Sequence, residues 1–250
     1  MSSLYFASVV AILSPLNAIY ATTLYLEDFE DGNVDYTLTA PAGRVIIEAS
    51  DGEFDYFGRI ASNGLSVSSD LNIAGATGDG YFGGNDFDAT STGDPGITED
   101  SAVFTVFGID ITGQNGLLFS GSFAEDTANN NPNWDSDTAI IVDVRIDGGS
   151  FNTIFAIQSE SLNGTNSAAR IDTNFDGVGD GALITNILTS YSAPISGSGS
   201  TLDLRISLNE FDANGEDFAF DNLSITSVPE PSTTLLIGLA AIGMIQRRRR

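Results

Sequence analysis

The stretches TAIIVDVRID (Thr138–Asp147) and TLDLRISL (Thr201–Leu208) decide the fold class. In both, an apolar residue recurs at every second position, and Asp, Arg or Ser stands at most positions between. A period of two places one set of side chains on a core and the other set in water, as in a half-buried strand. The sequence therefore predicts strands that cover a core with one face.

Glycine-containing turns separate further strands of this kind. Asn-Gly and Asp-Gly pairs favour the tight turns of hairpins. Such pairs stand at Asp147-Gly148, Asn214-Gly215 and Asn115-Gly116, and predicted strands follow at 151–157, 216–226 and 117–123. Many short strands, 27 Gly and no alternation of strands with helices predict an all-β fold, an antiparallel β-sandwich of the jelly-roll kind.

The composition excludes several kinds of chemistry. The 250 residues include no His and no Cys, and all nine basic residues are Arg. Nucleophilic triads need an imidazole or a thiol, and structural zinc sites draw on Cys and His. A formal net charge of −25 also disfavours nucleic acid as a partner, because phosphate contacts need a basic surface. Carboxylate chemistry remains: hard-cation binding, carbohydrate contacts or a two-carboxylate hydrolase.

The first 21 residues are expected to be a secretory signal peptide. They carry no charge, and a short apolar run from Leu4 to Leu13 is followed by Pro15 and by a small residue, Ala21. That run is too short for a membrane-spanning helix and fits a cleaved signal. A buried first strand or helix is the alternative, and the absence of basic residues before Leu4 is unusual for a signal.

The last residues have three parts in order: Pro229-Glu230-Pro231, an apolar stretch at 233–246, and Arg247, Arg248, Arg249 and Arg250. As a helix, the stretch would be about 21 Å long, short of the ~30 Å hydrocarbon core. It could cross the membrane if the bilayer thins and the Arg side chains reach the headgroups. The Arg cluster would stay on the cytoplasmic side, with the body outside.

This order of parts resembles the PEP-CTERM sorting tail of exported bacterial proteins, over residues 228–250. The resemblance implies recognition by an exosortase, a membrane protease-transpeptidase, and processing near Pro229–Pro231. It also implies a destination at the cell surface or in an extracellular matrix. An ordinary tail anchor after a proline-rich spacer is the alternative.

Residues 22–227 form the predicted β-sandwich ectodomain. They hold five Arg and 33 acidic residues, a net charge of −28, which favours solubility and would be relieved by bound cations. Two long loops are expected at 74–100 and 125–137. The body resembles jelly-roll ectodomains of exported bacterial proteins through LEDFEDG (26–32), DGG (147–149) and FDNL (220–223). A parity change in the last strand predicts a β-bulge at Asp221-Asn222.

The segment DTNFDGVGD at 172–180 is the sharpest candidate metal site. Oxygen-bearing residues at positions 1, 3, 5 and 9, with Gly at position 6, follow the first part of an EF-hand calcium loop. The ligands would be Asp172, Asn174, Asp176 and Asp180, with the carbonyl of Val178. Position 12 is Leu183 instead of the expected Glu. An Asp/Gly turn without metal is the alternative.

A second candidate calcium site would bring Asp28, Glu30 or Asp31, near the first strand, together with Asp221 of the last strand. In jelly-roll carbohydrate modules, carboxylates from these two strands often share a structural calcium, and the resemblance implies Glu30 and Asp221 in that role. Exposed acids without a metal are the alternative.

The single Trp of the chain suggests a sugar-binding platform. Trp134 could stack on a pyranose ring, while Asp135 and Asp137 accept hydrogen bonds from its hydroxyls. Packing of Trp134 in the core or at its rim is the alternative.

Taken together, the sequence predicts an exported, surface-anchored, non-catalytic β-sandwich protein with structural calcium. Its expected partners are an exosortase-type protease, the membrane and, in the alternative function of a carbohydrate-binding module, an exopolysaccharide. A glycoside hydrolase is the third reading, although no short motif marks a pair of catalytic carboxylates.

Overall fold

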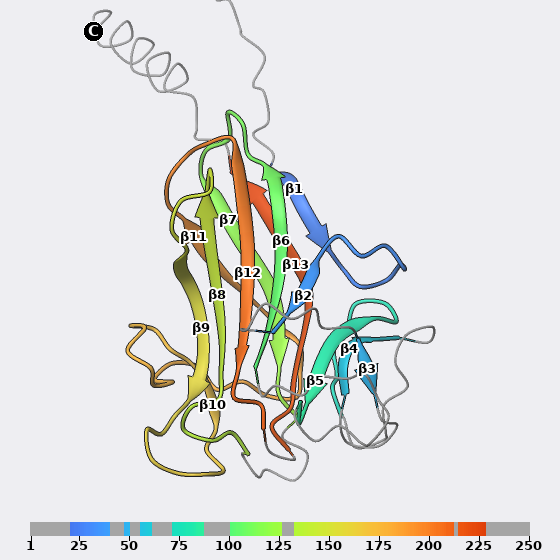
Figure 1. The fold of residues 1–250 in the computed structure, drawn as a ribbon, viewed down its shortest axis with the longest axis vertical. Coiled ribbons are helices and arrows are strands. Elements are labelled where there is room, and N and C mark those ends of the chain that lie inside the picture. The colour runs from blue at the N-terminus through green and yellow to red at the C-terminus, as the bar shows by residue number, and fades with distance from the viewer. Residues whose placement is uncertain are drawn as a thin grey trace, which may run out of the picture.

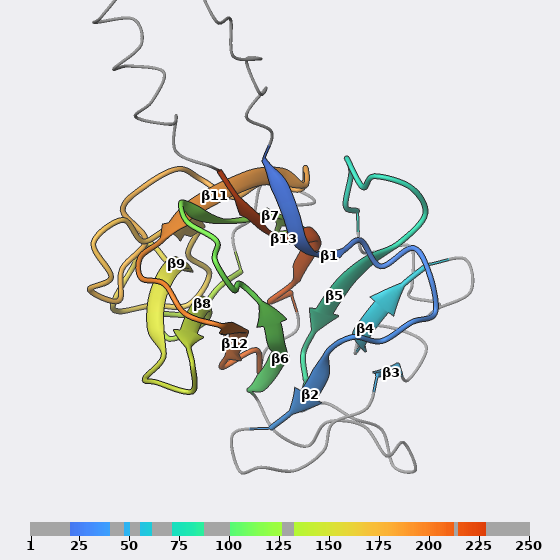
Figure 2. The ribbon, with the colours of Figure 1, turned by 90° about the horizontal axis from the view of Figure 1, so that it is seen from above.

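The computed structural model describes residues 21–40, 48–50, 56–61, 72–87, 101–126, 133–212 and 215–228. These residues form thirteen strands in two antiparallel sheets, which face one another as a sandwich (Figures 1 and 2). The predicted all-β sandwich is therefore confirmed. In the same residues we find no helix of the length and apolarity that crossing a membrane requires. Of the predicted signal peptide (1–21) and sorting tail (228–250), all but Ala21 and Val228 lie outside the described residues.

The first sheet has seven strands. In order they are β11 (Thr189–Ile195), β7 (Leu117–Ala124), β13 (Phe218–Ser227), β5 (Tyr81–Asn85), β4 (Tyr56–Ile60) and β3 (Ala49–Ser50), and β1 (Thr22–Glu27) pairs with the second half of β13. Because Thr22 pairs with Ser227, both ends of the described body lie at the same end of the sandwich.

The second sheet has six strands. In order they are β10 (Ala169–Ile171), β9 (Asn152–Ser159), β8 (Ala139–Ile146), β12 (Thr201–Asn209), β6 (Ala102–Asp110) and β2 (Thr37–Thr39). The two stretches with the clearest period of two, β8 and β12, are neighbours in the middle of this sheet. In β12 the alternate residues Leu202, Leu204 and Ile206 are fully buried, as their spacing predicts.

The predicted β-bulge in the last strand is confirmed. The pairing of β13 with β7 shifts register between Asp221 and Ser224, and Asn222 has a φ of 52°. On its other side, β13 pairs with β5 before the bulge and with β1 after it. The bulge therefore lies where β13 exchanges one neighbour for another.

Aromatic side chains fill the space between the sheets. Phe82 of β5 and Phe220 of β13 stack with ring centroids 4.9 Å apart, and Phe104 of β6 contacts both edge-on from the other sheet. Offset and edge-on aromatic pairs add stability beyond their burial. Gly84 leaves room for this packing, because a Cβ there would lie 2.5 Å from the ring of Phe218.

The expected long loop at 74–100 is wrong in part. Strand β5 lies within it and pairs with both β4 and β13. Its sequence, YFGGN, contains two Gly, which lowers its strand propensity. Tertiary packing overrides that preference, since Phe82 is fully buried.

Candidate functional site

The acidic loop at 172–180 begins directly after β10. Asp172 is buried, and its carboxylate accepts hydrogen bonds from the backbone N–H groups of Asn174 (3.1 Å), Phe175 (2.7 Å) and Gly177 (3.0 Å). Gly177 has a φ of 97°, which supplies the bend expected at position 6. Asp172, the first residue of the loop, is therefore the acceptor around which the following five residues fold.

The other predicted ligands of this loop accept hydrogen bonds from within it. Oδ1 of Asp180 accepts from the backbone N–H (2.9 Å) and the hydroxyl (2.8 Å) of Thr173, and these bonds lower the pKa of Asp180. Asp176 accepts from the amide of Asn174 (3.1 Å) and from the N–H of Val178 (3.2 Å). Among the described residues, the one group of three carboxylates with ligand atoms all within 4.8 Å of one another lies elsewhere. The loop as folded does not gather its carboxylates around one point.

The second predicted pair, Glu30 and Asp221, accepts hydrogen bonds from one short segment of backbone, residues 77–80. Glu30 accepts from the N–H groups of Asp79 (3.0 Å) and Gly80 (2.9 Å), whereas Asp221 accepts from the N–H of Thr77 (3.2 Å). The same short segment of chain therefore contacts both carboxylates.

The electrostatics of this pair suit a cation. Asp221 is fully buried, and burial raises its pKa to about 6, with a further contribution from the negative charges of Glu30 and Asp28. The two backbone donors lower the pKa of Glu30. A positive ion near both carboxylates would stabilise their charged forms.

The predicted sugar platform at Trp134 is wrong. Its side chain is 1% exposed, contacts Phe211 edge-on at 5.3 Å, and donates from Nε1 to the carbonyl of Asp217 (3.2 Å). The segment is held in place because Trp134 and Ser167 form a β-bridge. The indole therefore closes one end of the core, and no sugar can stack on it in this structure.

The two acids beside Trp134 have different surroundings. Asp137 is exposed, whereas the backbone N–H of Asp135 donates to Oε1 of Glu216 (2.9 Å). Glu216 is fully buried and also accepts from the N–H of Asp212 (2.9 Å). The carboxylates of Asp135, Asp212 and Glu216 form the group within 4.8 Å noted above. Its internal hydrogen bonds join the 133–138 segment to the loop before β13.

Sequence reasoning missed a second set of acids, buried where β7 ends and β13 begins. Glu125 is 1% exposed, and neither carboxylate oxygen makes a hydrogen bond of good geometry in the described residues, although the backbone N–H groups of Ala169 and Asn133 act on it and lower its pKa. Burial, with the charge of Asp217, raises the pKa of Glu125 to about 8. Asp217 accepts from the Tyr56 hydroxyl (2.9 Å) and from the amide of Asn85, and burial raises its pKa to about 7.

A register argument could have found these acids. Ala124 pairs with Ala219, so the residues that precede β13 lie beside those that follow β7. The sequence there reads AEDT at 124–127 and GEDF at 215–218, two acidic pairs that resemble solvated turns when each is considered alone.

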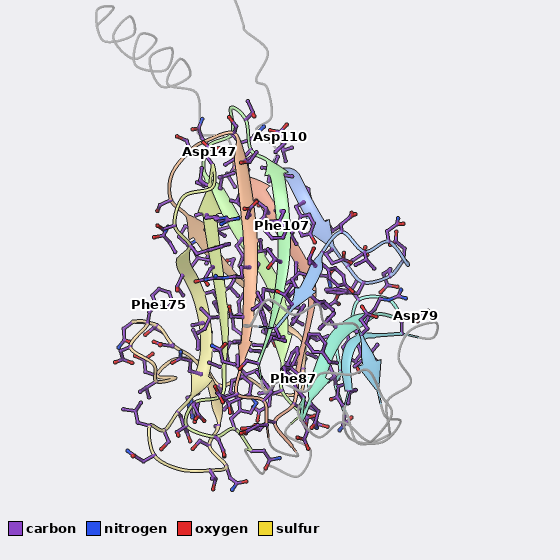
Figure 3. The ribbon with its side chains drawn as sticks, in the orientation of Figure 1. Asp79, Phe87, Phe107, Asp110, Asp147 and Phe175 are labelled. Carbon is purple, nitrogen blue, oxygen red and sulfur yellow. The ribbon has the colours of Figure 1, made fainter. Side chains whose placement is uncertain are left out.

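A groove of about 790 Å³ runs along the side of the sandwich, between the β8–β9 hairpin and the end of β11. Asn152 and Thr153 of β9 line one wall, and Pro194 and Ser196 line the other. Phe175, from the acidic loop, stands at its rim and is 49% exposed (Figure 3). Its volume is in the range of ligand-binding clefts.

Comparison with known protein families finds a match at the C-terminal residues of the chain. Residues 227–250 match the PEP-CTERM protein-sorting motif. This PEP-CTERM tail begins at the final residue of β13, Ser227, and it confirms the expected resemblance. The motif indicates an exported protein that an exosortase-type system sorts. No curated protein sequence matches the chain.

Several solved structures can be superposed loosely on this one, and each alignment includes more than 80% of the chain. One is a cleaved adhesin domain of Lys-gingipain from Porphyromonas gingivalis, 13% identical, with a TM-score of 0.43 over 82% of this chain and 98% of that domain. Another is a CBM22-1 xylan-binding domain from Paenibacillus barcinonensis, 12% identical, with a TM-score of 0.39 over 86% and 99%. A cyclase from Fischerella sp. is 10% identical, with a TM-score of 0.46 over 85% and 100%.

Proposed function

We propose that this chain is an exported, non-catalytic β-sandwich protein of the cell envelope or extracellular matrix. The observation that carries the proposal is the PEP-CTERM tail at residues 227–250, attached directly to the last strand of a β-sandwich. The net charge of −28 on residues 22–227 suits a domain that stays in solution outside the cell. The apolar stretch at 233–246 would hold the chain in the membrane until an exosortase processes it.

The charge of the tail tests this proposal. Replacing Arg247, Arg248, Arg249 and Arg250 by Ala should leave the exported protein unprocessed or mislocalised in cell fractions. The matched variant with four Lys keeps the positive charge and should keep the membrane orientation. Normal processing of the Ala variant would count against sorting by this tail.

Calcium is part of the same proposal as a structural ion. Glu30 and Asp221 are the better of the two predicted sites, because both belong to segments fixed by β1 and β13 and because Asp221 is buried beside other negative charges. Asp172, Asn174, Asp176, Val178 and Asp180 remain a second candidate set, which would have to exchange internal hydrogen bonds for the ion. The increase in melting temperature on adding calcium, compared between variants of each site, distinguishes the two sites.

The second candidate function is carbohydrate binding. The groove between the β8–β9 hairpin and β11 favours it, because polar side chains and one exposed aromatic ring line a cleft of suitable size. Retention on immobilised polysaccharide tests this function independently of export.

A further inference from the structure

The lining of the groove differs in charge from the rest of the protein. Acidic residues make up 34 of the 250 residues, yet none of the 13 residues that line the groove is acidic. The one charged residue in the lining, Arg145, forms an ion pair with Asp203 (2.7 Å). The groove is therefore close to neutral on a strongly negative body.

The groove presents hydrogen-bonding groups that carry no charge. Ser150, Asn152, Ser196 and Ser198 are all exposed, and their hydroxyls and amide can both donate and accept. Between them lie apolar side chains, including that of Ile154. A surface with both features complements a sugar, whose hydroxyls need donors and acceptors and whose C–H groups need apolar contact.

The aromatic ring at the rim is held there by its loop. Phe175 has a φ of 60°, which is uncommon for a bulky side chain, and its N–H donates to the buried carboxylate of Asp172 (2.7 Å). Residues held in sparsely populated conformations occur often at ligand-binding sites. The hydrogen bonds of the acidic loop thus fix an exposed ring beside the groove.

The opposite wall is also held in place. Oδ1 of Asp147 accepts from the backbone N–H groups of Ser200 (2.9 Å) and Thr201 (2.9 Å), which ties the loop after β11 to the β8–β9 turn. A Cβ on Gly199 would lie 2.3 Å from the side chain of Ile146, so the two loops are in close contact. A groove between fixed walls binds a ligand at a lower entropic cost.

From these observations we propose that the groove binds one chain of an uncharged polysaccharide. The proposal deepens the carbohydrate-binding function above and rests on the extracellular location. Charge favours a neutral over an acidic glycan: the body carries −28, so an acidic polymer would meet repulsion, and Arg145, the one charged residue of the lining, already forms an ion pair with Asp203. Phe175 stacks on the sugar ring, while Asn152 and Ser196 bind hydroxyls from opposite walls.

Affinity electrophoresis tests the proposal on the protein recovered from exporting cells. The probes are three uncharged polymers (xylan, galactomannan and dextran) and one acidic polymer, polygalacturonate. At least one uncharged polymer should retard the protein, and the retardation should be the same at 50 mM and at 500 mM NaCl. Retardation by polygalacturonate alone, with strong salt dependence, would overturn the proposal, as would retardation by none of the four.

Variants locate the binding. Phe175→Ala and Asn152→Ala should each weaken retention about fivefold or more. Leu162→Ala is the matched control, because Leu162 is 63% exposed and lies outside the lining of the groove. Thermal unfolding of each variant checks that it is folded. If Phe175→Ala proves unstable, Phe175→Leu replaces it in the test. Because Phe175→Leu keeps an apolar side chain, it should bind more weakly than the parent but retain part of the affinity. Retention of Phe175→Ala equal to that of Leu162→Ala would overturn the proposal, whereas correct export of a non-binding protein leaves the sorting proposal standing.

Discussion

The negative charge of Asp217 adds to burial in holding the pKa of Glu125 near 8, at the point where β7 ends and β13 begins. These carboxyls come from separate acidic pairs that are 92 positions apart in the chain. Burial outweighs the backbone N–H groups of Ala169 and Asn133, which lower the pKa of Glu125, so the buried carboxyl favours its neutral form.

We expect this acid to make the protein less stable as the pH rises. A carboxyl with a raised folded pKa holds its proton more tightly when folded, so its contribution is complete below the ordinary value of 4.5 and is lost as the pH rises through about 8. In that window each pH unit costs ~1.4 kcal/mol per fully shifted group, or about 3–5 °C in Tm. Thermal melts in chelator between pH 5 and pH 9 measure this slope.

Glu125→Gln isolates the contribution of that residue. The amide cannot ionise, so the variant should match the parent near pH 5 and melt at a higher temperature at pH 8.5. Asp137→Asn is the control, because Asp137 is exposed. Equal slopes for the parent and Glu125→Gln would contradict a buried neutral Glu125.

Calcium should stabilise the protein through Asp221. At 100 times the dissociation constant, a bound ion adds ~2.7 kcal/mol, or about 5–10 °C in Tm. We expect Asp221→Asn to remove most of this gain, whereas Asp176→Asn in the acidic loop should keep it. The same calcium shift in the parent and in Asp221→Asn, measured by differential scanning calorimetry, would exclude the Glu30–Asp221 site.

Trp134 should matter for stability alone. Trp134→Ala is expected to lower the free energy of unfolding by about 3–5 kcal/mol, because it removes a fully buried aromatic side chain and leaves a cavity. Below its melting temperature the variant should bind any polysaccharide as the parent does. A loss of binding by the folded variant would restore the sugar platform that the structure argues against.

Asp172 should stabilise its loop without a metal. Asp172→Ala removes the acceptor of three backbone N–H groups and is expected to cost about 2–3 kcal/mol, measured by urea unfolding in chelator. Asp172→Asn keeps one acceptor oxygen and should lose less. If both variants unfold at the same urea concentration as the parent, the loop does not depend on Asp172.

The period of two in β8 and β12 is sufficient to predict the sandwich, because a strand with one buried face has alternating apolar and polar residues. The bulge at Asp221-Asn222 was also predictable, since a change of parity needs an extra residue. Strand β5 was not, because its two Gly resemble a loop and only its pairing with β4 and β13 makes it a strand.

Burial accounts for the errors at the candidate sites. Trp134 and Glu125 both stand next to polar, loop-like sequence. The neighbouring residues therefore give no sign that these two side chains are buried. The groove was equally hidden, because its walls come from β9, from the end of β11 and from the loop after β10, which only the tertiary structure brings together.

The intact mass of the mature protein tests the central claim most directly. It should be compared in a host with an exosortase and in the same host without one, after separation of cytosol, membrane and exterior. We expect the mass from the first host to lack the signal segment and the tail beyond Pro229–Pro231, and the second host to retain the tail in the membrane fraction. A protein found in the cytosol of both hosts at the full mass of 250 residues would contradict the account.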